Sequence, residues 1–176
     1  MLMMSVTDRL STFLSRKPSI DSSVFIANNA TVLGDVRIGA DSSIWYQAVL
    51  RGDINHIQIG EGTNLQDGVI CHLSDDYPVV VGNYVTVGHG AIIHACTIED
   101  ECLIGMNSTI LDGAVIGRNS IVAAGTVVPV GTVVPAGSLV AGVPGVVKKE
   151  LSSSQRCSIR GWAEKYIEVK EAHRKL

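Results

Sequence analysis

An aliphatic side chain recurs every six residues over most of the chain. The series runs from Ile20 to Leu50 and resumes over Ile59–Cys71 after three inserted residues. Four more inserted residues precede Val81–Val87, and after the loss of one position the series continues over Ile98–Val140. A helix would repeat every 3.6 residues and a half-buried strand every two, so neither explains this pattern. A fixed period of this kind is typical of a repeat protein built as a solenoid.

A β-solenoid accounts for the period. Each repeat of six residues supplies one short strand and a turn, and three repeats complete a triangular coil of 18 residues. Successive coils then stack at the strand spacing of about 4.8 Å. Small residues often stand four places after the aliphatic position, and Gly, Asn or Asp supply the turns, as at Gly34-Asp35 and Gly82-Asn83. We therefore predict an all-β solenoid over residues 20–150, preceded by an N-terminal segment at residues 1–19.

The last part of the chain, residues 151–176, departs from the period. Ser152 and Gln155 have the spacing of a helix capping box. A stripe at helical spacing follows, formed by Ile159, Trp162, Ala163, Tyr166 and Val169. These signals predict a C-terminal α-helix that packs along the solenoid or along a neighbouring one.

Composition and charge exclude several classes of protein. The 14 Lys and Arg residues against 17 Asp and Glu residues give a net charge of −3, without the basic cluster that nucleic acid binding needs. Eighteen glycines interrupt the apolar stretches, so no segment is expected to span a membrane. Residues 1–17 have no apolar core of a signal peptide, and we expect a soluble, cytoplasmic protein. The cysteines show no C-x-x-C spacing, and we expect four free, buried thiols: Cys71, Cys96, Cys102 and Cys157.

Three histidines lie within 23 consecutive positions, at His72, His89 and His94. From His72 to His94 is 22 positions, and removing the four inserted residues leaves 18, which is one coil. The two imidazoles should therefore lie one above the other on one face, about 5 Å apart. That separation suits two ligands of one metal ion, although solvated imidazoles on a polar face would produce the same pattern.

His89 stands five residues before His94 and belongs to the adjacent face, around a corner. A neighbouring subunit could bring its own His89 to the pair. Three neutral imidazoles with an open fourth position are characteristic of catalytic zinc. This reading requires a cyclic oligomer with metal sites between subunits, and a trimer fits a triangular prism best.

Polar residues surround these histidines in the sequence. Arg51 and Asp53 precede them, as do Asn64, Gln66 and Asp67. Gln66 and Asp67 precede His72 by less than one coil and face the same region, so they could orient the imidazoles. Taken alone, Arg51 and Asp53 would equally suit an ion pair at the surface.

Several of these motifs resemble one known family. They are Arg51-Gly52-Asp53, Asn64-Leu65-Gln66-Asp67-Gly68 leading into His72, Gly88-His89-Gly90-Ala91-Ile92-Ile93-His94, and Ile104-Gly105-Met106. With the repeats, they resemble the γ-class carbonic anhydrases and their YrdA-like bacterial relatives. The resemblance implies a left-handed parallel β-helix and a homotrimer. It also implies Zn²⁺, with Fe²⁺ or Co²⁺ as substitutes, held by His72 and His94 of one subunit and His89 of the next.

The same resemblance implies roles for other residues. Arg51 would bridge to Asp67 across the subunit interface, while Asp53, Asn64 and Gln66 line the site. Tyr166 would lie near the metal, although packing of the helix explains a tyrosine there equally well. The implied activity is that of a lyase, the reversible hydration of CO₂ to bicarbonate by attack of a metal-bound hydroxide.

Two departures from the family pattern concern proton transfer. Ile54 stands where the archaeal archetype has a glutamate after the Arg-x-Asp motif, and the loop over residues 73–80 is short. Asp75 and Asp76 could carry protons instead.

Two alternative functions stay open. One is a hexapeptide-repeat acyltransferase or thioesterase-like protein with one histidine as general base. The other is a metal-binding trimer that lacks carbonic anhydrase turnover.

Overall fold

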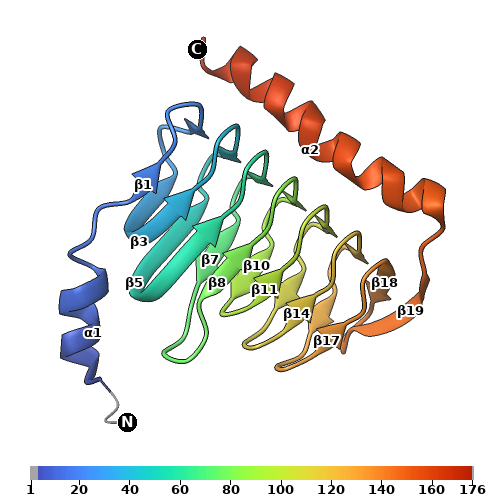
Figure 1. Cartoon of the computed structure of the whole chain (residues 1–176), viewed down its shortest axis with the longest axis horizontal. Coiled ribbons are helices and arrows are strands. Elements are labelled where there is room, and N and C mark those ends of the chain that lie inside the picture. The colour runs from blue at the N-terminus through green and yellow to red at the C-terminus, as the bar shows by residue number, and fades with distance from the viewer. Residues whose placement is uncertain (1–3, 176) are drawn as a thin grey trace.

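The computed structural model describes residues 4–175, in which short parallel strands stack into a solenoid with a helix near each end (Figure 1). The strands occupy three faces. The first face contains the leading parts of β3 (Thr31–Ile38) and β5 (Val49–Ile59), followed by β7 (Ile70–His72), β10 (Ile92–His94), β13 (Thr109–Ile110) and β16 (Val127–Val128).

The second face begins with β1 and continues through the trailing parts of β3 and β5. Its members are β1 (Ser19–Ile20), β8 (Val79–Val81), β11 (Thr97–Ile98), β14 (Val115–Ile116) and β17 (Val133–Val134). Because β3 and β5 run around the corner between these two faces, both faces belong to one hydrogen-bonded sheet.

The third face is a separate sheet. It contains β2 (Phe25–Ile26), β4 (Ser43–Ile44), β6 (Asn64–Leu65), β9 (Thr86–Val87), β12 (Leu103–Ile104), β15 (Ile121–Val122) and β18 (Ser138–Ala141). The last strand, β19 (Val146–Glu150), pairs antiparallel with β18 and ends the stack. The prediction of a left-handed parallel β-helix of hexapeptide repeats is confirmed.

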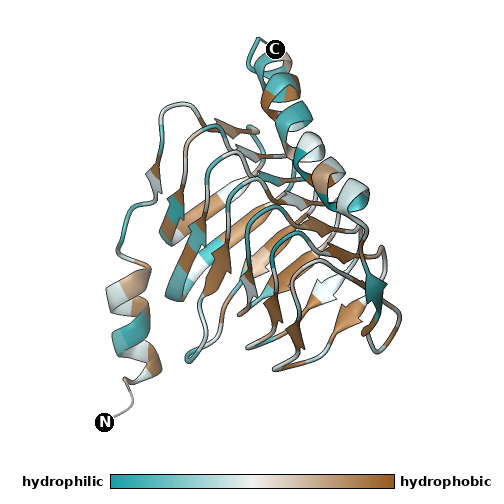
Figure 2. Ribbon diagram, turned by 45° about the vertical axis from the view of Figure 1, so that its right-hand side comes forward, coloured by the Kyte–Doolittle hydropathy of each residue, from teal (hydrophilic) through white to brown (hydrophobic). Residues whose placement is uncertain are grey.

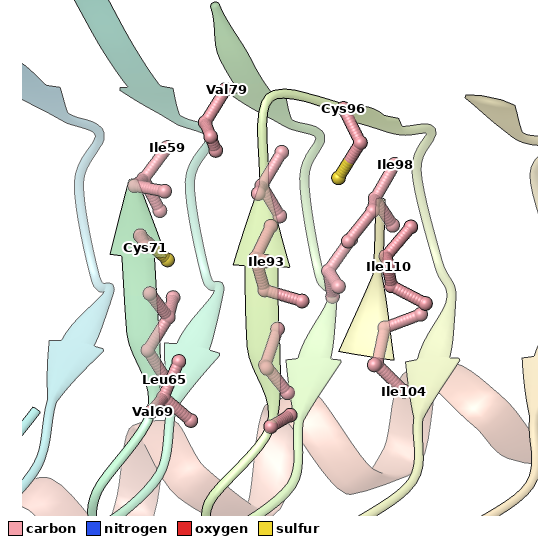
Figure 3. Close-up of a cluster of buried hydrophobic side chains, with 14 of the residues drawn as sticks. Ile59, Leu65, Val69, Cys71, Val79, Ile93, Cys96, Ile98, Ile104 and Ile110 are labelled. Atoms are coloured by element: carbon pink, nitrogen blue, oxygen red, sulfur yellow. The ribbon is translucent and has the colours of Figure 1, made fainter. Parts of the chain in front are cut away.

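The aliphatic positions of the repeat form the core. Equivalent residues pair from coil to coil, as Ile44 does with Leu65 and Leu65 with Val87, and all three are fully buried. Figure 3 shows neighbouring members, including Ile59 and Ile93, pointing into the interior. The hydropathy colouring shows the same division, with hydrophobic strands and more polar turns (Figure 2). Burial of one aliphatic residue per strand is therefore what holds each coil on the next.

Small polar residues close the corners. Ser42 and Thr63 are fully buried, and their hydroxyls donate to the carbonyl oxygens of Gly60 and Gly82 at 2.7 Å. Each hydrogen bond joins one coil to the next. The small hydroxyl side chain four places after the aliphatic residue therefore fits the corner and satisfies a buried carbonyl group.

The N-terminal segment contains a helix that the sequence pattern did not predict, α1 (Val6–Phe13), capped by Ser5. Arg9 holds it to the solenoid, since its Nη1 donates to the carbonyl oxygens of Ile54 at 3.2 Å and Asp75 at 3.0 Å. No residue of the helix is fully buried, and these polar contacts are among those that connect it to the solenoid.

The C-terminal helix is confirmed as α2 (Ser153–His173), and the capping box of Ser152 and Gln155 is formed. The helix runs back along the coils towards the N-terminal end of the solenoid (Figure 1). Ile159 and Ala163 are buried against the solenoid, whereas Trp162 is half-exposed in the single chain, so its packing against a neighbouring solenoid stays a prediction. Trp162 lies at the edge of the contact, with the ammonium group of Lys165 5.6 Å from its ring centre.

The cysteines divide into two groups. Cys71, Cys96 and Cys102 are free and buried, as expected, whereas Cys157 is free but exposed, so that part of the expectation is wrong. Cys157 belongs to the first turns of α2, at a position that the described residues leave exposed. No helix in residues 4–175 is long and apolar enough to cross a membrane.

Candidate metal centre

His72 and His94 lie side by side on the first face of the solenoid. They end β7 and β10, adjacent parallel strands in which the two residues are direct register partners. Their ring centres are 5.3 Å apart, and Nδ1 of His72 lies 3.3 Å from Nε2 of His94. The stacking expected from one coil of separation is confirmed.

The outer nitrogen of each imidazole contacts a carboxylate. Nε2 of His72 lies 3.1 Å from Oδ1 of Asp53, and Nδ1 of His94 lies 2.5 Å from Oδ1 of Asp112. An ionised carboxylate only accepts hydrogen bonds, so each outer nitrogen carries the proton in the neutral ring. The inner nitrogens then face each other with lone pairs, an arrangement that a cation between them would stabilise.

The distance between the inner nitrogens fits a tetrahedral ion. Zinc binds imidazole nitrogen at about 2.0–2.1 Å, so two ligands at the tetrahedral angle are about 3.3 Å apart. The observed separation is also 3.3 Å. Burial lowers the pKa of His72, which favours the neutral, metal-binding form, while the hydrogen bond with Asp53 opposes this in part. The pair therefore fits two ligands of a metal such as Zn²⁺.

Asp53 connects this pair to Arg51. Both lie on β5, and Nη1 of Arg51 donates to Oδ2 of Asp53. Burial raises the pKa of the Asp53 carboxyl, but the hydrogen bonds from Arg51 and His72 outweigh it, so the net pKa lies below the ordinary value. Asp53 is therefore an ionised acceptor that His72 and Arg51 share. Within one chain Arg51 contacts Asp53, and an Arg51–Asp67 bridge across an interface stays a prediction.

His89 lies around the corner, in the turn after β9 on the third face. The pairing of Leu65 with Val87 places Asp67 in the coil before His89, and Nδ1 of His89 lies 2.7 Å from Oδ2 of Asp67. Nε2 of His89 is the nitrogen left for a metal. The His89 and Asp67 side chains are 47% and 44% exposed, so both are accessible to a neighbouring molecule. Within residues 4–175 of one chain, no three His, Cys, Asp or Glu side chains gather around a point that could hold a metal ion.

The remaining candidates line a cavity between the third face and α2. Gln66, His89 and Tyr166 contribute to its wall, and its volume is about 440 Å³. Asn64 is buried beside it, accepting from Nε2 of Gln66 at 3.2 Å and donating to Oγ1 of Thr86 at 3.0 Å. Asn64 therefore positions Gln66, whose side chain faces the cavity.

The side chain of Tyr166 has contacts on two sides. Its ring packs edge-on against Trp45, with the ring centres 5.3 Å apart, and its side chain also lines the cavity. Burial raises the pKa of Tyr166, and the nearby Asp67 raises it further. Helix packing of Tyr166 is therefore confirmed, whereas its proximity to a metal stays a prediction.

The two acidic residues of the loop at positions 73–80 lie outside this arrangement. Asp75 pairs with Arg9 of α1, at 3.5 Å between Oδ1 and Nε. Asp75 and Asp76 are both exposed. Ile54 is partly buried against the hydrophobic core.

Asp112 is the site residue that the sequence pattern missed. It stands 18 positions after His94, which is the length of one coil, so this spacing was the available signal. The backbone register differs by one position, because Ile93 pairs with Ile110. The missing position in the series of aliphatic residues marks the turn at which the register of neighbouring coils changes.

Comparison with known proteins places the chain in a family. A family model described as bacterial transferase hexapeptide (six repeats) matches residues 95–129. A solved structure of a proposed acetyltransferase from Bacillus cereus has a TM-score of 0.89 at 40% identity, over 92% of this chain and 94% of that one. A hexapeptide transferase family protein from Anaplasma phagocytophilum has a TM-score of 0.83 at 41% identity, over 88% and 92%.

Several relatives are named carbonic anhydrases. A proposed carbonic anhydrase of Methanocaldococcus jannaschii is 49% identical over 86% of this chain and 96% of its own length. The carbonic anhydrase of Geobacillus kaustophilus is 43% identical over 93% and 90%. Mitochondrial gamma carbonic anhydrase 2 of Arabidopsis thaliana is 41% identical over 90% of this chain, which spans 59% of that longer protein. The chain therefore belongs to the γ-class carbonic anhydrase family of hexapeptide-repeat proteins.

Proposed function

We propose that the chain is a metal-dependent carbonic anhydrase that catalyses the reversible hydration of CO₂ to bicarbonate. The observation that carries the proposal is the His72–His94 pair, with two inner nitrogens 3.3 Å apart and a carboxylate on each outer nitrogen. Zn²⁺ suits this donor set, and Fe²⁺ or Co²⁺ would be accepted by the same imidazoles. Relatives of similar length named as carbonic anhydrases support the same activity.

A neighbouring subunit would supply the third ligand, His89. Beside the imidazole pair, Ile70 and Ile92 are register partners on the first face and are 43% and 38% exposed. A second copy of the chain packed on this face would bury these side chains and bring its own His89 to the pair. Since the coil is triangular, three copies related by a threefold axis give a closed homotrimer with three equivalent sites.

The side chains around the site have distinct tasks. A metal held there would lower the pKa of a coordinated water, the known effect of zinc in carbonic anhydrases, and so provide the nucleophile at neutral pH. Asp53 and Asp67 hold the protons of His72 and His89 on the nitrogens directed away from the metal. Gln66 and Tyr166 offer hydrogen-bond donors to an oxygen of the substrate, and the apolar cavity wall suits CO₂ itself.

Arg51 would join the subunits by reaching Asp67 of the next one, because its guanidinium group is partly exposed and Asp53 is its only ion-pair partner in residues 4–175. Proton release would depend on Asp75 and Asp76, since Ile54 cannot carry a proton. Asp75 pairs with Arg9, so α1 lies close to this proposed route. The alternative is a trimer that binds metal but lacks a working proton route. An assay of CO₂ hydration distinguishes it from an active enzyme.

An acyltransferase is the second candidate, favoured by the names of the two solved structures that match this chain at about 40% identity. A general base needs one histidine with access to the acceptor. It does not need two imidazoles with facing nitrogens, each bonded to its own carboxylate. The histidine pair therefore favours the metal-dependent reaction.

The first experiment is elemental analysis of untagged protein, followed by a CO₂ hydration assay. We expect about one metal ion per subunit and a hydration rate above the buffer background. Failure to take up Zn²⁺, Fe²⁺ or Co²⁺ would contradict the proposal, and transfer from acetyl-CoA to amine acceptors would then be tested. One metal per subunit without hydration would identify the metal-binding trimer.

A mixing experiment tests the shared site. His72→Ala and His89→Ala should each lose metal binding, because each lacks one of three ligands. When the two variants are dissociated, mixed equally and reassembled, a junction is intact if its first subunit carries His89→Ala and its neighbour carries His72→Ala. Random assembly makes about a quarter of the junctions intact, so metal content should recover to about a quarter of the wild-type value.

The matched control mixes His72→Ala with His94→Ala. These ligands belong to the same subunit's face, so this mixture should recover nothing. Equal recovery in both mixtures, or none in the first despite verified subunit exchange, would show that the ligands do not come from two subunits.

A further inference from the structure

The turn that carries Asp112 is one residue longer than the turn of the coil before it. Ile93 pairs with Ile110, and after the corner Thr97 pairs with Val115. Three residues therefore separate the paired positions in one coil and four in the next. The additional residue moves Asp112, the second residue after its aliphatic position, into contact with His94, the first residue after its own.

Backbone hydrogen bonds hold this longer turn on both sides. The N–H of Gly113 donates to the carbonyl oxygen of Ala95 at 2.7 Å, and the N–H of Gly131 donates to that of Asp112 at 2.9 Å. Gly113 has a φ of +66°, and a Cβ there would lie 3.3 Å from the ring of Tyr77. The backbone position of Asp112 is therefore set by the coils before and after it and by the Tyr77 loop.

Within residues 4–175 the carboxylate of Asp112 has one side-chain partner, which is His94. Oδ1 of Asp112 lies 2.5 Å from Nδ1 of His94, and both side chains are about one third exposed. Asp53 differs, because Arg51 shares it with His72. The Asp112 carboxylate thus contacts one imidazole, whereas the Asp53 carboxylate is shared between two side chains.

We infer that Asp112 is a positioning residue for His94, an inference that rests on the proposed metal site. By accepting from Nδ1, its carboxylate keeps the proton on that atom and directs the lone pair of Nε2 towards His72. It also increases the electron density of the ring, which strengthens the imidazole as a metal ligand. Loss of such a partner typically weakens metal affinity by about 10–100-fold.

The test compares Asp112→Ala and Asp112→Asn with wild type and with Glu168→Gln, which removes a negative charge from the exposed side of α2. The first measurement is Zn²⁺ affinity by competition with a chromogenic chelator. We expect both Asp112 variants to bind Zn²⁺ about 10–100-fold more weakly and Glu168→Gln to match wild type. Asp112→Glu should recover part of the affinity, because it retains the carboxylate.

The second measurement is made on metal-free protein at pH 8, where ¹⁵N NMR distinguishes the two neutral tautomers of His94. Wild type should show the proton on Nδ1, and Asp112→Ala should shift the population towards Nε2. This result does not depend on metal binding. Thermal unfolding of each variant checks that it is folded, and Asp112→Asn serves if the alanine variant is not.

The outcomes distinguish the inference about Asp112 from the proposed function. Unchanged Zn²⁺ affinity and an unchanged His94 tautomer in both folded Asp112 variants would overturn the inference while leaving the proposed function in place. If wild type itself takes up no Zn²⁺, the proposed function fails, and the role of Asp112 in metal binding fails with it. A merely structural role for Asp112 would lower thermal stability without moving the tautomer.

Discussion

Nδ1 of His72 lies 3.3 Å from Nε2 of His94, although 22 positions and an inserted loop separate the two residues in the chain. The contact follows from stacking, since the loop over residues 73–78 leaves the solenoid and returns in register, and Ile59 pairs with Val81 beyond it. Each imidazole then meets a carboxylate from another coil, which determines which nitrogen faces inward. A donor pair that is already held at the distance a metal needs has less to rearrange on binding, and preorganisation of this kind favours affinity.

Replacement of Gly34 by Ala should disturb both stability and the site. A Cβ at Gly34 would overlap the carbonyl group of Gly52, which lies between Arg51 and Asp53. Gly125→Ala is the control, because Gly125 has a similar positive φ of +68° but an open space around it. We expect Gly34→Ala to lower the free energy of unfolding by about 1–3 kcal/mol more than Gly125→Ala. Urea denaturation checks this, and equal losses in the two variants would contradict the expected overlap.

Lys170 should hold the end of α2 on the first coils. Its side chain is 1% exposed, and Nζ donates to the carbonyl oxygen of Ser23 at 2.8 Å and to Oδ1 of Asp41 at 3.0 Å. Lys170→Ala should lower the free energy of unfolding by about 1–3 kcal/mol and speed amide exchange in the last turns of α2. Lys165→Ala, an exposed lysine on the same helix, is the control and should change both quantities little. Similar exchange rates in the two variants would mean that Lys170 does not anchor the helix.

The four thiols should differ in reactivity. Burial raises the pKa of Cys71, and it raises the pKa values of Cys96 and Cys102 to about 12, so these three remain protonated and inaccessible at pH 8. Cys157 is exposed. Titration with a chromogenic disulfide reagent should modify about one thiol per native chain and four after unfolding, and Cys157→Ser should abolish the native reaction. Modification of several thiols in native Cys157→Ser would show that the core opens readily.

His56 should make the fold more sensitive to acid. Burial lowers its pKa, Arg37 and Arg16 lower it further, and Asp35 opposes the shift. Because the folded pKa is below the unfolded value, the unfolded chain binds the proton more readily. The native state is therefore at full stability above about pH 6.5 and loses stability as the pH falls through the folded pKa. In metal-free protein, His56→Gln should remove this contribution, so its unfolding free energy should fall less than that of wild type between pH 7.5 and pH 5. Parallel curves for the two proteins would exclude the effect.

The amino-acid sequence by itself determined the repeat, the coil and the histidine pair. A period of six residues is a local property, because every coil must place one aliphatic residue inside each strand and a small residue at each corner. Subtracting the inserted loop then placed His72 against His94, and the Ser152–Gln155 box correctly located the start of α2.

Only the tertiary structure decided the features that depend on turns of unequal length and on how the two helices pack against the solenoid. Counting by 18 from His94 reaches Asp112, but only the structure shows that a turn one residue longer than its neighbour brings the two side chains into contact. Arg9 connects α1, a helix without a fully buried residue, to carbonyl groups that are distant in the chain. Trp162 and Cys157 are exposed in the single chain, on parts of α2 that the solenoid does not bury. Local spacing defines which residues share a face, whereas the packing of whole elements determines which of those residues meet a partner.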